Sequence, residues 1–265
     1  MYDFQLARPR SLPEAVEAMQ AEEAQPLSGG QTLIPTLKAR LGAPGTLVDL
    51  TGIAELKGIS RSGDVLRIGG ATRHADVAGS AEVQGAIPAL AALAGKIGDP
   101  AVRNRGTIGG SLANNDPAAC YPSAALGLGA TLHTSAGRAI AADDFFLGLF
   151  ETALEERELL TAAAFPVPLA ADYQKFEQPA SRFALVGVFV ARFADGARVA
   201  VTGASEGGVF RWAEAEQALS ADFSLSALDG MSHPAEGMIG DLHGSPRYRA
   251  HLVGVLTRRA VAACG

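Results

Sequence analysis

The sequence lacks long apolar runs and has only two cysteines among its 265 residues. Apolar stretches such as residues 86–95 reach about ten residues, whereas a membrane-spanning helix needs about 18 or more. The N-terminus has no cationic head followed by an apolar segment, which is the pattern of a signal peptide. We therefore expect a cytoplasmic chain without a transmembrane segment.

Cysteine, the ligand of structural zinc and iron–sulfur sites, is scarce in this sequence. Cys120 and Cys264 are too few for a four-thiolate zinc or iron–sulfur site. We expect no metal site on this chain, so any metal chemistry would belong to another polypeptide. The histidines show no ligand spacing, and each is predicted to be a surface or core residue: His74, His133, His233, His243 and His251.

Positive charge is in deficit, with 22 Lys and Arg against 28 Asp and Glu and a net charge of −6. Surfaces that bind nucleic acid are basic, so we expect no nucleic-acid partner. The common nucleotide-binding fingerprints are also missing. Gly127-Leu-Gly129 lacks the third glycine of G-x-G-x-x-G, and Gly95-Lys96 lacks the upstream glycine of a P-loop.

Glycine, by contrast, is abundant, with 31 glycines and 14 prolines in a chain that is 48% hydrophobic. This composition and length predict a sizeable core and one large or two small domains. The glycines follow no collagen-like period. They therefore indicate many turns and close approaches of the backbone.

Hydrophobic periodicity predicts an α+β protein. The pattern of predicted helices and strands changes near residues 165–168. Ser11 and Glu14 form a capping box that opens an amphipathic helix over residues 12–23. Short strands at hairpin spacing follow residue 168. The other expected helices are 32–40, 83–96, 213–219 and 246–263, and the expected strands are 46–50, 65–68, 130–134, 159–165, 173–177, 186–193, 197–204 and 209–212.

One hydrolase pattern is present, Gly203-Ala-Ser205-Glu-Gly207, which matches G-x-S-x-G. A nucleophile elbow needs a helix directly after the serine, whereas the next residues favour a strand and a plain hairpin turn. A serine hydrolase using Ser205 is therefore a remote alternative. Its candidate partners would be Asp229, Asp241, His243 and His251.

Two Gly-Gly loops carry the strongest chemical signal. The first spans residues 27–35 and contains Gly29-Gly30, and the second spans residues 103–111 and contains Gly109-Gly110. Adjacent residues without Cβ allow successive N–H groups to converge on an anion. Two such cradles fit a diphosphate held between two lobes. The alternative is a pair of tight turns in a glycine-rich protein.

The sequences of both loops resemble those of the FAD-binding medium subunits of the molybdenum hydroxylases. This family includes carbon monoxide dehydrogenase and xanthine dehydrogenase. That family carries A-G-G-[QH]-[ST]-L-[LI]-P and R-N-x-G-[TS]-[IL]-G-G-[ND] loops. Here the first has Ser28 for alanine and the second ends in Ser111. The likeness spans the chain, from Phe4 to Tyr248-Arg249.

The resemblance implies a PCMH-type, two-subdomain FAD-binding fold over residues 1–168, with subdomains of about 1–55 and 56–168. A small C-terminal antiparallel sheet with helices would follow over residues 169–265. The FAD-binding residues implied are Ser28, Gly29, Gly30, Gln31, Thr32, Thr107, Gly109, Gly110, Ser111, Asn114, Asp116, Leu160, Tyr173 and Lys175.

Three of these positions have specific implied roles, each with a structural alternative. Tyr173 would cover the flavin ring, and Lys175 would lie near its pyrimidine edge; the alternative for Lys175 is a solvated strand residue. Leu160 would touch the ring edge or pack in the core. Cys120 stands where relatives often carry Asp or Glu, which puts flavin contact at that position in doubt.

The resemblance also implies a function. The chain would pass electrons from a small [2Fe-2S] subunit through FAD to an external acceptor, while a large molybdopterin subunit hydroxylates the substrate. No residue of this chain is assigned a catalytic role. A stand-alone FAD-dependent oxidoreductase is the alternative.

Overall fold

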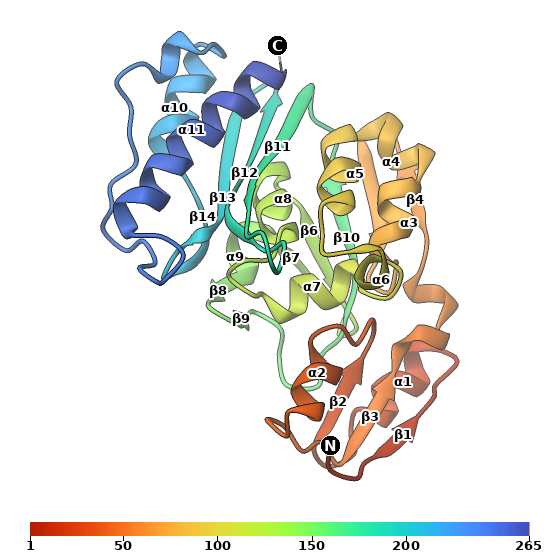
Figure 1. The fold of residues 1–265 in the computed structure, drawn as a ribbon. Coiled ribbons are helices and arrows are strands. Elements are labelled where there is room, and N and C mark those ends of the chain that lie inside the picture. Colours follow the sequence, from red (N-terminus) through yellow and green to blue (C-terminus); the bar gives the residue numbers. More distant parts are fainter. Residues whose placement is uncertain (265) are drawn as a thin grey trace.

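The structure, a computed structural model, describes residues 1–264 of the chain. Figure 1 shows three units in chain order, coloured red-orange, yellow-green and cyan to blue. Helices and strands are mixed along the chain, in agreement with the predicted α+β class. Across residues 1–264, no helix combines the length and apolar character needed to cross a membrane.

The N-terminal unit is a small parallel sheet with strand order β1-β3-β2. Two short helices connect its strands. Leu47 and Val48 of the central strand are fully buried. The elements are β1 (Gln5–Ala7), α1 (Leu12–Ala18), β2 (Ala24–Leu27), α2 (Leu33–Lys38), β3 (Thr46–Asp49), η1 (Leu50–Gly52) and η2 (Ala54–Leu56).

Helix α1 has the predicted cap but not the predicted length. The Ser11 hydroxyl accepts a hydrogen bond from the Glu14 amide at 3.4 Å. The helix ends at Ala18 instead of residue 23. The Gln20 amide already bonds only three residues back, and Glu23 adopts a left-handed φ of 51°. The chain has therefore left the helical path before residue 23.

The central unit is an antiparallel sheet of order β4-β5-β10-β6-β7 covered by helices. Figure 1 places α3, α4 and α5 beside β4 and β10, with α7 and α8 nearer the middle of the molecule. The elements are β4 (Ile59–Ser62), β5 (Val65–Gly69), α3 (His74–Gly79), α4 (Ala81–Ala86), α5 (Pro88–Gly95), α6 (Pro100–Arg103), α7 (Ile108–Asn114), α8 (Tyr121–Leu128), β6 (Thr131–Thr134), β7 (Ala139–Ala141), α9 (Ala142–Phe145), β8 (Phe146–Gly148), β9 (Glu151–Thr152) and β10 (Leu160–Pro166).

The single apolar helix predicted over residues 83–96 is wrong in one respect, because the chain breaks it in two. Helix α4 ends before Ile87, whose φ of −140° and ψ of 77° are not helical. Proline disfavours a helical conformation in the residue before it and lacks an N–H group. Pro88 therefore ends one helix and begins the next.

The C-terminal unit is an antiparallel sheet of order β11-β12-β13-β14. Helices α10 and α11 cover one face, and α8 of the central unit packs on the other (Figure 1). As a result, Phe189 of β12 joins the same hydrophobic cluster as Tyr121 of α8. The elements are β11 (Ala170–Glu177), β12 (Ala184–Phe193), β13 (Gly196–Ser205), β14 (Gly208–Arg211), α10 (Ala213–Ala221), η3 (Ser226–Leu228) and α11 (Pro246–Cys264).

The G-x-S-x-G pattern forms a hairpin turn, so the nucleophile elbow is excluded. Ser205 ends β13 and pairs with Gly208, the first residue of β14. Its hydroxyl accepts a hydrogen bond from the Gly207 amide at 3.0 Å. A strand, and not a helix, follows the serine. One proposed partner, Asp241, is also already held by Arg249 at 2.6 Å.

Strand β13 fastens a loop of the central unit. The buried Thr202 hydroxyl donates to the Ala119 carbonyl at 2.7 Å and lies 3.0 Å from the Pro117 carbonyl oxygen. The Gly203 amide donates to the same Pro117 oxygen at 2.8 Å. The segment after Asp116 is thereby fixed to the C-terminal sheet.

Replacing Thr202 with Val should therefore destabilise the protein by about 0.5–1.5 kcal/mol, because the isosteric side chain cannot donate to the half-buried Ala119 carbonyl. Thr202→Ser, which keeps the hydroxyl, is the matched control and should lose less. Urea unfolding followed by circular dichroism measures both. A Val variant as stable as the wild type would contradict the role of this hydroxyl.

Candidate cofactor-binding site

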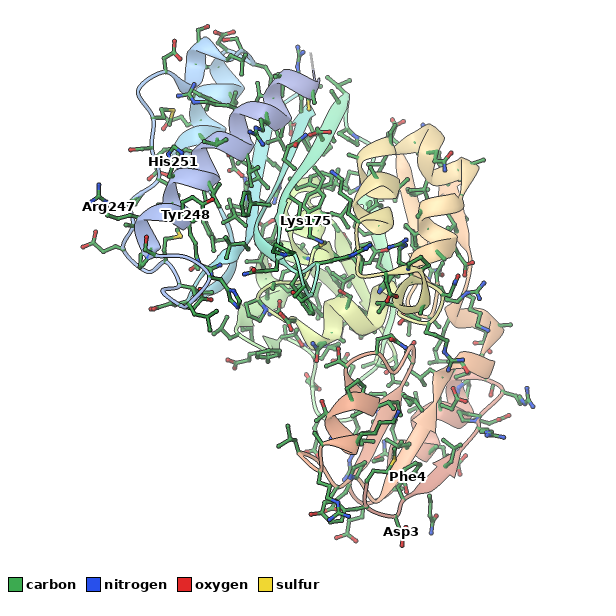
Figure 2. All side chains as sticks on the ribbon, viewed as in Figure 1. Asp3, Phe4, Lys175, Arg247, Tyr248 and His251 are labelled. Atoms are coloured by element: carbon green, nitrogen blue, oxygen red, sulfur yellow. The ribbon has the colours of Figure 1, made fainter. Side chains whose placement is uncertain are left out.

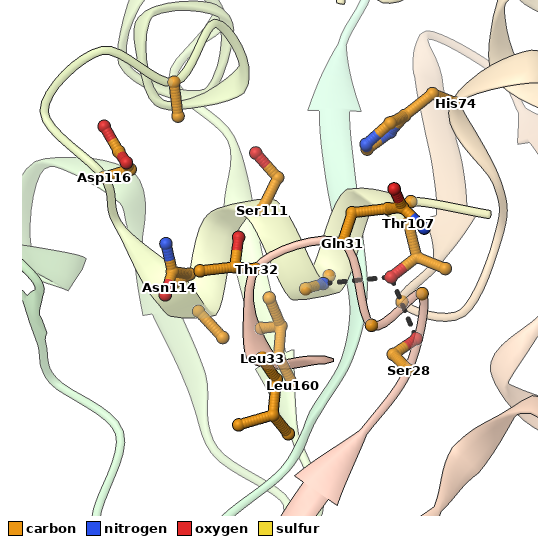
Figure 3. Close-up of a pocket in the computed structure, with 18 of the residues that line it drawn as sticks. Ser28, Gln31, Thr32, Leu33, His74, Thr107, Ser111, Asn114, Asp116 and Leu160 are labelled. Carbon is orange, nitrogen blue, oxygen red and sulfur yellow. Dashed lines mark hydrogen bonds between the residues drawn. The ribbon is translucent and has the colours of Figure 1, made fainter. Parts of the chain in front are cut away.

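The two glycine loops lie against each other, with their hydroxyl groups in contact (Figure 3). A Cβ on Gly29 would lie 2.5 Å from the Gly106 Cα and closer still to the Arg105 carbonyl oxygen. The Ser28 and Thr107 hydroxyl oxygens are 2.9 Å apart. Only a residue without a side chain allows this approach. The two loops, distant in sequence, thus form one continuous surface.

The first loop offers free backbone donors. It connects β2 to α2 and turns at Gly30, whose φ is +71°. Within residues 1–264, the amides of residues 29–32 donate to no protein acceptor. Successive unpaired amides in a turn of this kind form a concave anion site. The loop thus presents unpaired backbone donors, and phosphate binding by these amides stays a prediction.

The second loop is built differently, because its amides are already used. Ile108 donates to the Thr72 carbonyl at 3.0 Å and Gly109 to the Gly70 carbonyl at 2.8 Å. The Gly110 amide donates to the Thr107 hydroxyl at 3.2 Å, which caps α7. Gly109 and Gly110 therefore shape a rigid loop and do not offer free donors.

A cavity of about 730 Å³ opens where the loops meet. Cofactor and small-molecule sites are typically roughly 300–1,000 Å³. Its wall includes all but one of the predicted residues: Ser28, Gly29, Gly30, Gln31, Thr32, Thr107, Gly109, Gly110, Ser111, Asn114, Asp116, Leu160 and Lys175.

Tyr173 is the exception, and its predicted place over a flavin ring does not match the structure. Its side chain is 1% exposed and is not part of the cavity wall. The ring packs near Phe189, with centroids 6.3 Å apart, and beneath the Lys96 ammonium. Burial raises the pKa of this phenol well above its usual value. Tyr173 is therefore a core residue behind the wall.

Lys175 does reach the cavity, two residues further along β11. Its ammonium donates to the Lys96 carbonyl at 2.8 Å, and the Lys96 ammonium donates back to the Tyr173 carbonyl at 3.3 Å. These reciprocal bonds tie the end of α5 to β11. They place a cation at the junction of the central and C-terminal units.

His74 is a wall residue that the sequence pattern did not identify. It was predicted to be a surface or core histidine, yet it is 4% exposed and lines the cavity. Pairing between Arg73 and Thr107 brings it to the second glycine loop. Burial, with the Arg103 guanidinium as a second cause, lowers the pKa of His74 to about 4. The imidazole is therefore neutral at pH 7.

Cys120 and Glu158 also line the cavity. Cys120 is buried and lies at the start of α8. Glu158 is ionised: burial raises the pKa of its carboxyl, but hydrogen bonds from Arg138, Thr134 and the Glu155 amide outweigh burial and bring it to about 2. No spacing in the sequence connects these residues to the loops, because tertiary packing alone assembles them.

The depressed pKa of His74 predicts a pH dependence of stability. Between pH 6.5 and 4 the unfolded chain binds a proton here that the folded chain does not. The free energy of unfolding therefore falls as the pH decreases through this window. In His74→Gln that fall should be smaller by about 1–3 kcal/mol, as measured by urea unfolding from pH 7 to pH 4. An unchanged pH dependence would contradict the assignment.

Comparison with known proteins agrees with this geometry. The sequence profile described as "FAD binding domain in molybdopterin dehydrogenase" matches residues 2–168. The chain is 32% identical to the nicotine 6-hydroxylase medium subunit of Paenarthrobacter nicotinovorans, over 98% of this chain and 96% of that subunit. It is 34% identical to the carbon monoxide dehydrogenase medium chain of Afipia carboxidovorans, over 97% of this chain and 95% of that chain.

Solved structures show the same likeness in three dimensions. A chain of quinoline 2-oxidoreductase from Pseudomonas putida 86 superposes with a TM-score of 0.89 at 31% identity, covering 99% of this chain and 97% of that one. A carbon monoxide dehydrogenase chain from Hydrogenophaga pseudoflava gives a TM-score of 0.88 at 31% identity, with the same coverage. This chain therefore belongs to the FAD-binding medium subunits of the molybdenum hydroxylase family and is an oxidoreductase component whose cofactor is FAD.

Proposed function

We propose that this chain is the electron-transfer subunit of a heteromeric molybdenum hydroxylase. In that role it receives electrons from a [2Fe-2S] partner subunit and delivers them to an external acceptor. A large partner subunit would hold the molybdopterin. The relatives in the comparison are medium chains or medium subunits, and one solved structure similar to this chain is that of a Cu,Mo carbon monoxide dehydrogenase.

The observation that carries the proposal is the cavity at the contact between the glycine loops. It combines unpaired amides at residues 29–32 with the hydroxyls of Ser111 and Thr107. A dinucleotide needs donors for its diphosphate and polar partners along its ribityl chain. The chain's net charge of −6 leaves backbone dipoles as the main anion donors. The donor set therefore fits FAD.

Each part of the cavity has a separate task in this proposal. The amides of the first loop bind the diphosphate, while Ser111, Asn114 and Asp116 face the ribityl chain. Asp116 is itself held by the Ala118 amide at 2.8 Å, which fixes the turn that carries it. Leu160, which lines the cavity and is largely buried, would touch the ring edge. When bound, FAD supplies a group that accepts electrons singly and releases them in pairs.

The three units divide this work. We infer that residues 1–55 and 56–168 are the two FAD-binding subdomains and that residues 169–265 form the C-terminal domain over the flavin. The separate parallel sheet, five-stranded antiparallel sheet and four-stranded antiparallel sheet support these limits. The site between units depends on Lys175 and on the hydrogen bonds from Thr202.

The proposal is tested by affinity purification of the chain from its native host. We expect a yellow preparation with stoichiometric FAD and two co-purifying chains, identified by mass spectrometry, that carry the molybdenum and iron. Turnover of a small substrate by the isolated yellow chain would instead support a stand-alone FAD-dependent oxidoreductase. A colourless protein that also fails to take up added FAD would overturn both.

The first loop gives a sharp variant. Gly30→Val should weaken FAD binding at least about tenfold, because φ of +71° strains any L side chain and its Cβ would lie 3.0 Å from Ile34 Cγ1. Gly110→Val should have a similar effect, since its Cβ would lie 2.9 Å from the Thr107 hydroxyl. Gly79→Ala, in open space on α3, is the control. Fluorescence titration of the apoprotein measures all three, and full flavin retention in both Val variants would contradict the assigned cradle.

Lys175 provides an electrostatic test. A cation near the flavin pyrimidine edge favours the reduced, negatively charged form. Lys175→Ala should therefore retain FAD but lower its reduction potential by about 30 mV or more, which is roughly 1.4 kcal/mol for two electrons. Lys175→Arg keeps the charge and should shift the potential less. Potentiometric titration measures the reduction potential of the bound flavin in each variant. An unchanged potential in the Ala variant would refute this role.

A further inference from the structure

A few buried polar side-chain atoms have no hydrogen-bond partner, and one of them belongs to the cavity residue His74. Across residues 1–264 the structure contains four such side-chain atoms. Folded proteins leave few polar groups unpaired, so each one calls for a physical explanation. Two of the four belong to neighbouring side chains, His74 and Tyr121, whose ring centroids are 5.3 Å apart. The four atoms are His74 Nδ1, Tyr121 Oη, Tyr173 Oη and Arg249 Nε.

His74 meets the cavity with one edge only. Its Nδ1 is buried without a partner, while a Cβ on Gly106 would lie 2.6 Å from its Nε2. The absence of a side chain at Gly106 thus makes room for the imidazole. Figure 3 shows the ring extending toward Thr107 and Gln31, over the second glycine loop. The Nε2 edge therefore faces the place where the two loops meet.

A neutral imidazole has one N–H donor and one acceptor nitrogen, and its surroundings decide which is which. The Tyr121 hydroxyl is a buried donor without a partner on the ring that neighbours the imidazole, although the structure holds no hydrogen bond between this hydroxyl and Nδ1. If Tyr121 donates to Nδ1, the proton of the imidazole must sit on Nε2. Both buried atoms are then satisfied, and His74 presents an N–H group to the cavity.

We propose that His74 is a cofactor-contacting residue whose Nε2–H donates to an acceptor oxygen in the diphosphate–ribityl segment of FAD. Tyr121 is its positioning residue: a small shift of either ring would let its hydroxyl donate to Nδ1, which would fix the imidazole proton on Nε2. This inference rests on the proposed FAD site. It assigns to the second loop a donor that the occupied amides of Gly109 and Gly110 cannot supply.

Affinity measurements on the full chain test the contact. His74→Leu should raise the dissociation constant for FAD about tenfold, the loss expected for one hydrogen bond of about 1.4 kcal/mol. His74→Gln, which retains an N–H donor of similar reach, should recover part of the affinity. His251→Leu, at an exposed position on α11 (Figure 2), is the matched control and should bind FAD normally.

Titration with ADP distinguishes the two kinds of acceptor oxygen, because ADP has the diphosphate but no ribityl chain. A loss of affinity for both FAD and ADP places the contact at the diphosphate. A loss for FAD alone places it at the ribityl chain. Equal affinity of His74→Leu and wild type for both molecules overturns the inference, while FAD binding by the wild type would still stand.

Tyr121 is tested by a readout that packing alone would not change. Nitrogen-15 NMR of histidine-labelled, FAD-bound protein should show His74 as the Nε2–H tautomer. Tyr121→Phe removes one oxygen and keeps the ring, so the fold survives; it should shift the tautomer ratio and weaken FAD binding about twofold. Tyr248→Phe, at an exposed tyrosine (Figure 2), should change neither. An Nδ1–H tautomer in the wild type, or an unaltered ratio in Tyr121→Phe, overturns the role of Tyr121.

Discussion

The contact between Gly29 and the Arg105–Gly106 backbone determines the geometry of the site. It joins the parallel sheet of the N-terminal unit to the helices of the central unit at a separation that no side chain would allow. The hydrogen-bonding contact between Ser28 and Thr107 lies beside it. The cavity opens at this close packing of backbone on backbone, and the unpaired amides of the first loop lie beside it.

Both loops contain a Gly-Gly pair, but they differ in their physical roles. The first keeps its amides unpaired and is therefore free to bind an anion. The second uses its amides to lock itself to Gly70 and Thr72 and to cap α7, which makes it a rigid platform. The first loop supplies the hydrogen-bond donors. The second loop is fixed in place and sets the position of the first loop against the cavity.

The sequence predicted what depends on local chemistry. Paired glycines, the capping box at Ser11 and the hairpin strands after residue 168 can be predicted because neighbouring residues determine them. The place of Tyr173 was implied by the resemblance alone, and a motif letter does not give the depth of a side chain, which here is buried behind the cavity wall. His74 and Cys120 reach the cavity through contacts between distant segments. The break at Pro88, in contrast, follows from a local rule that the apolar pattern obscured.

The hydrogen bonds from Thr202 and Gly203 have a consequence for biogenesis. They hold the carbonyls of Pro117 and Ala119, next to the cavity residue Asp116. During synthesis, this wall has no such support until β13 has left the ribosome, some eighty residues after the loop itself. This side of the cavity is therefore completed only after about three quarters of the chain has been made.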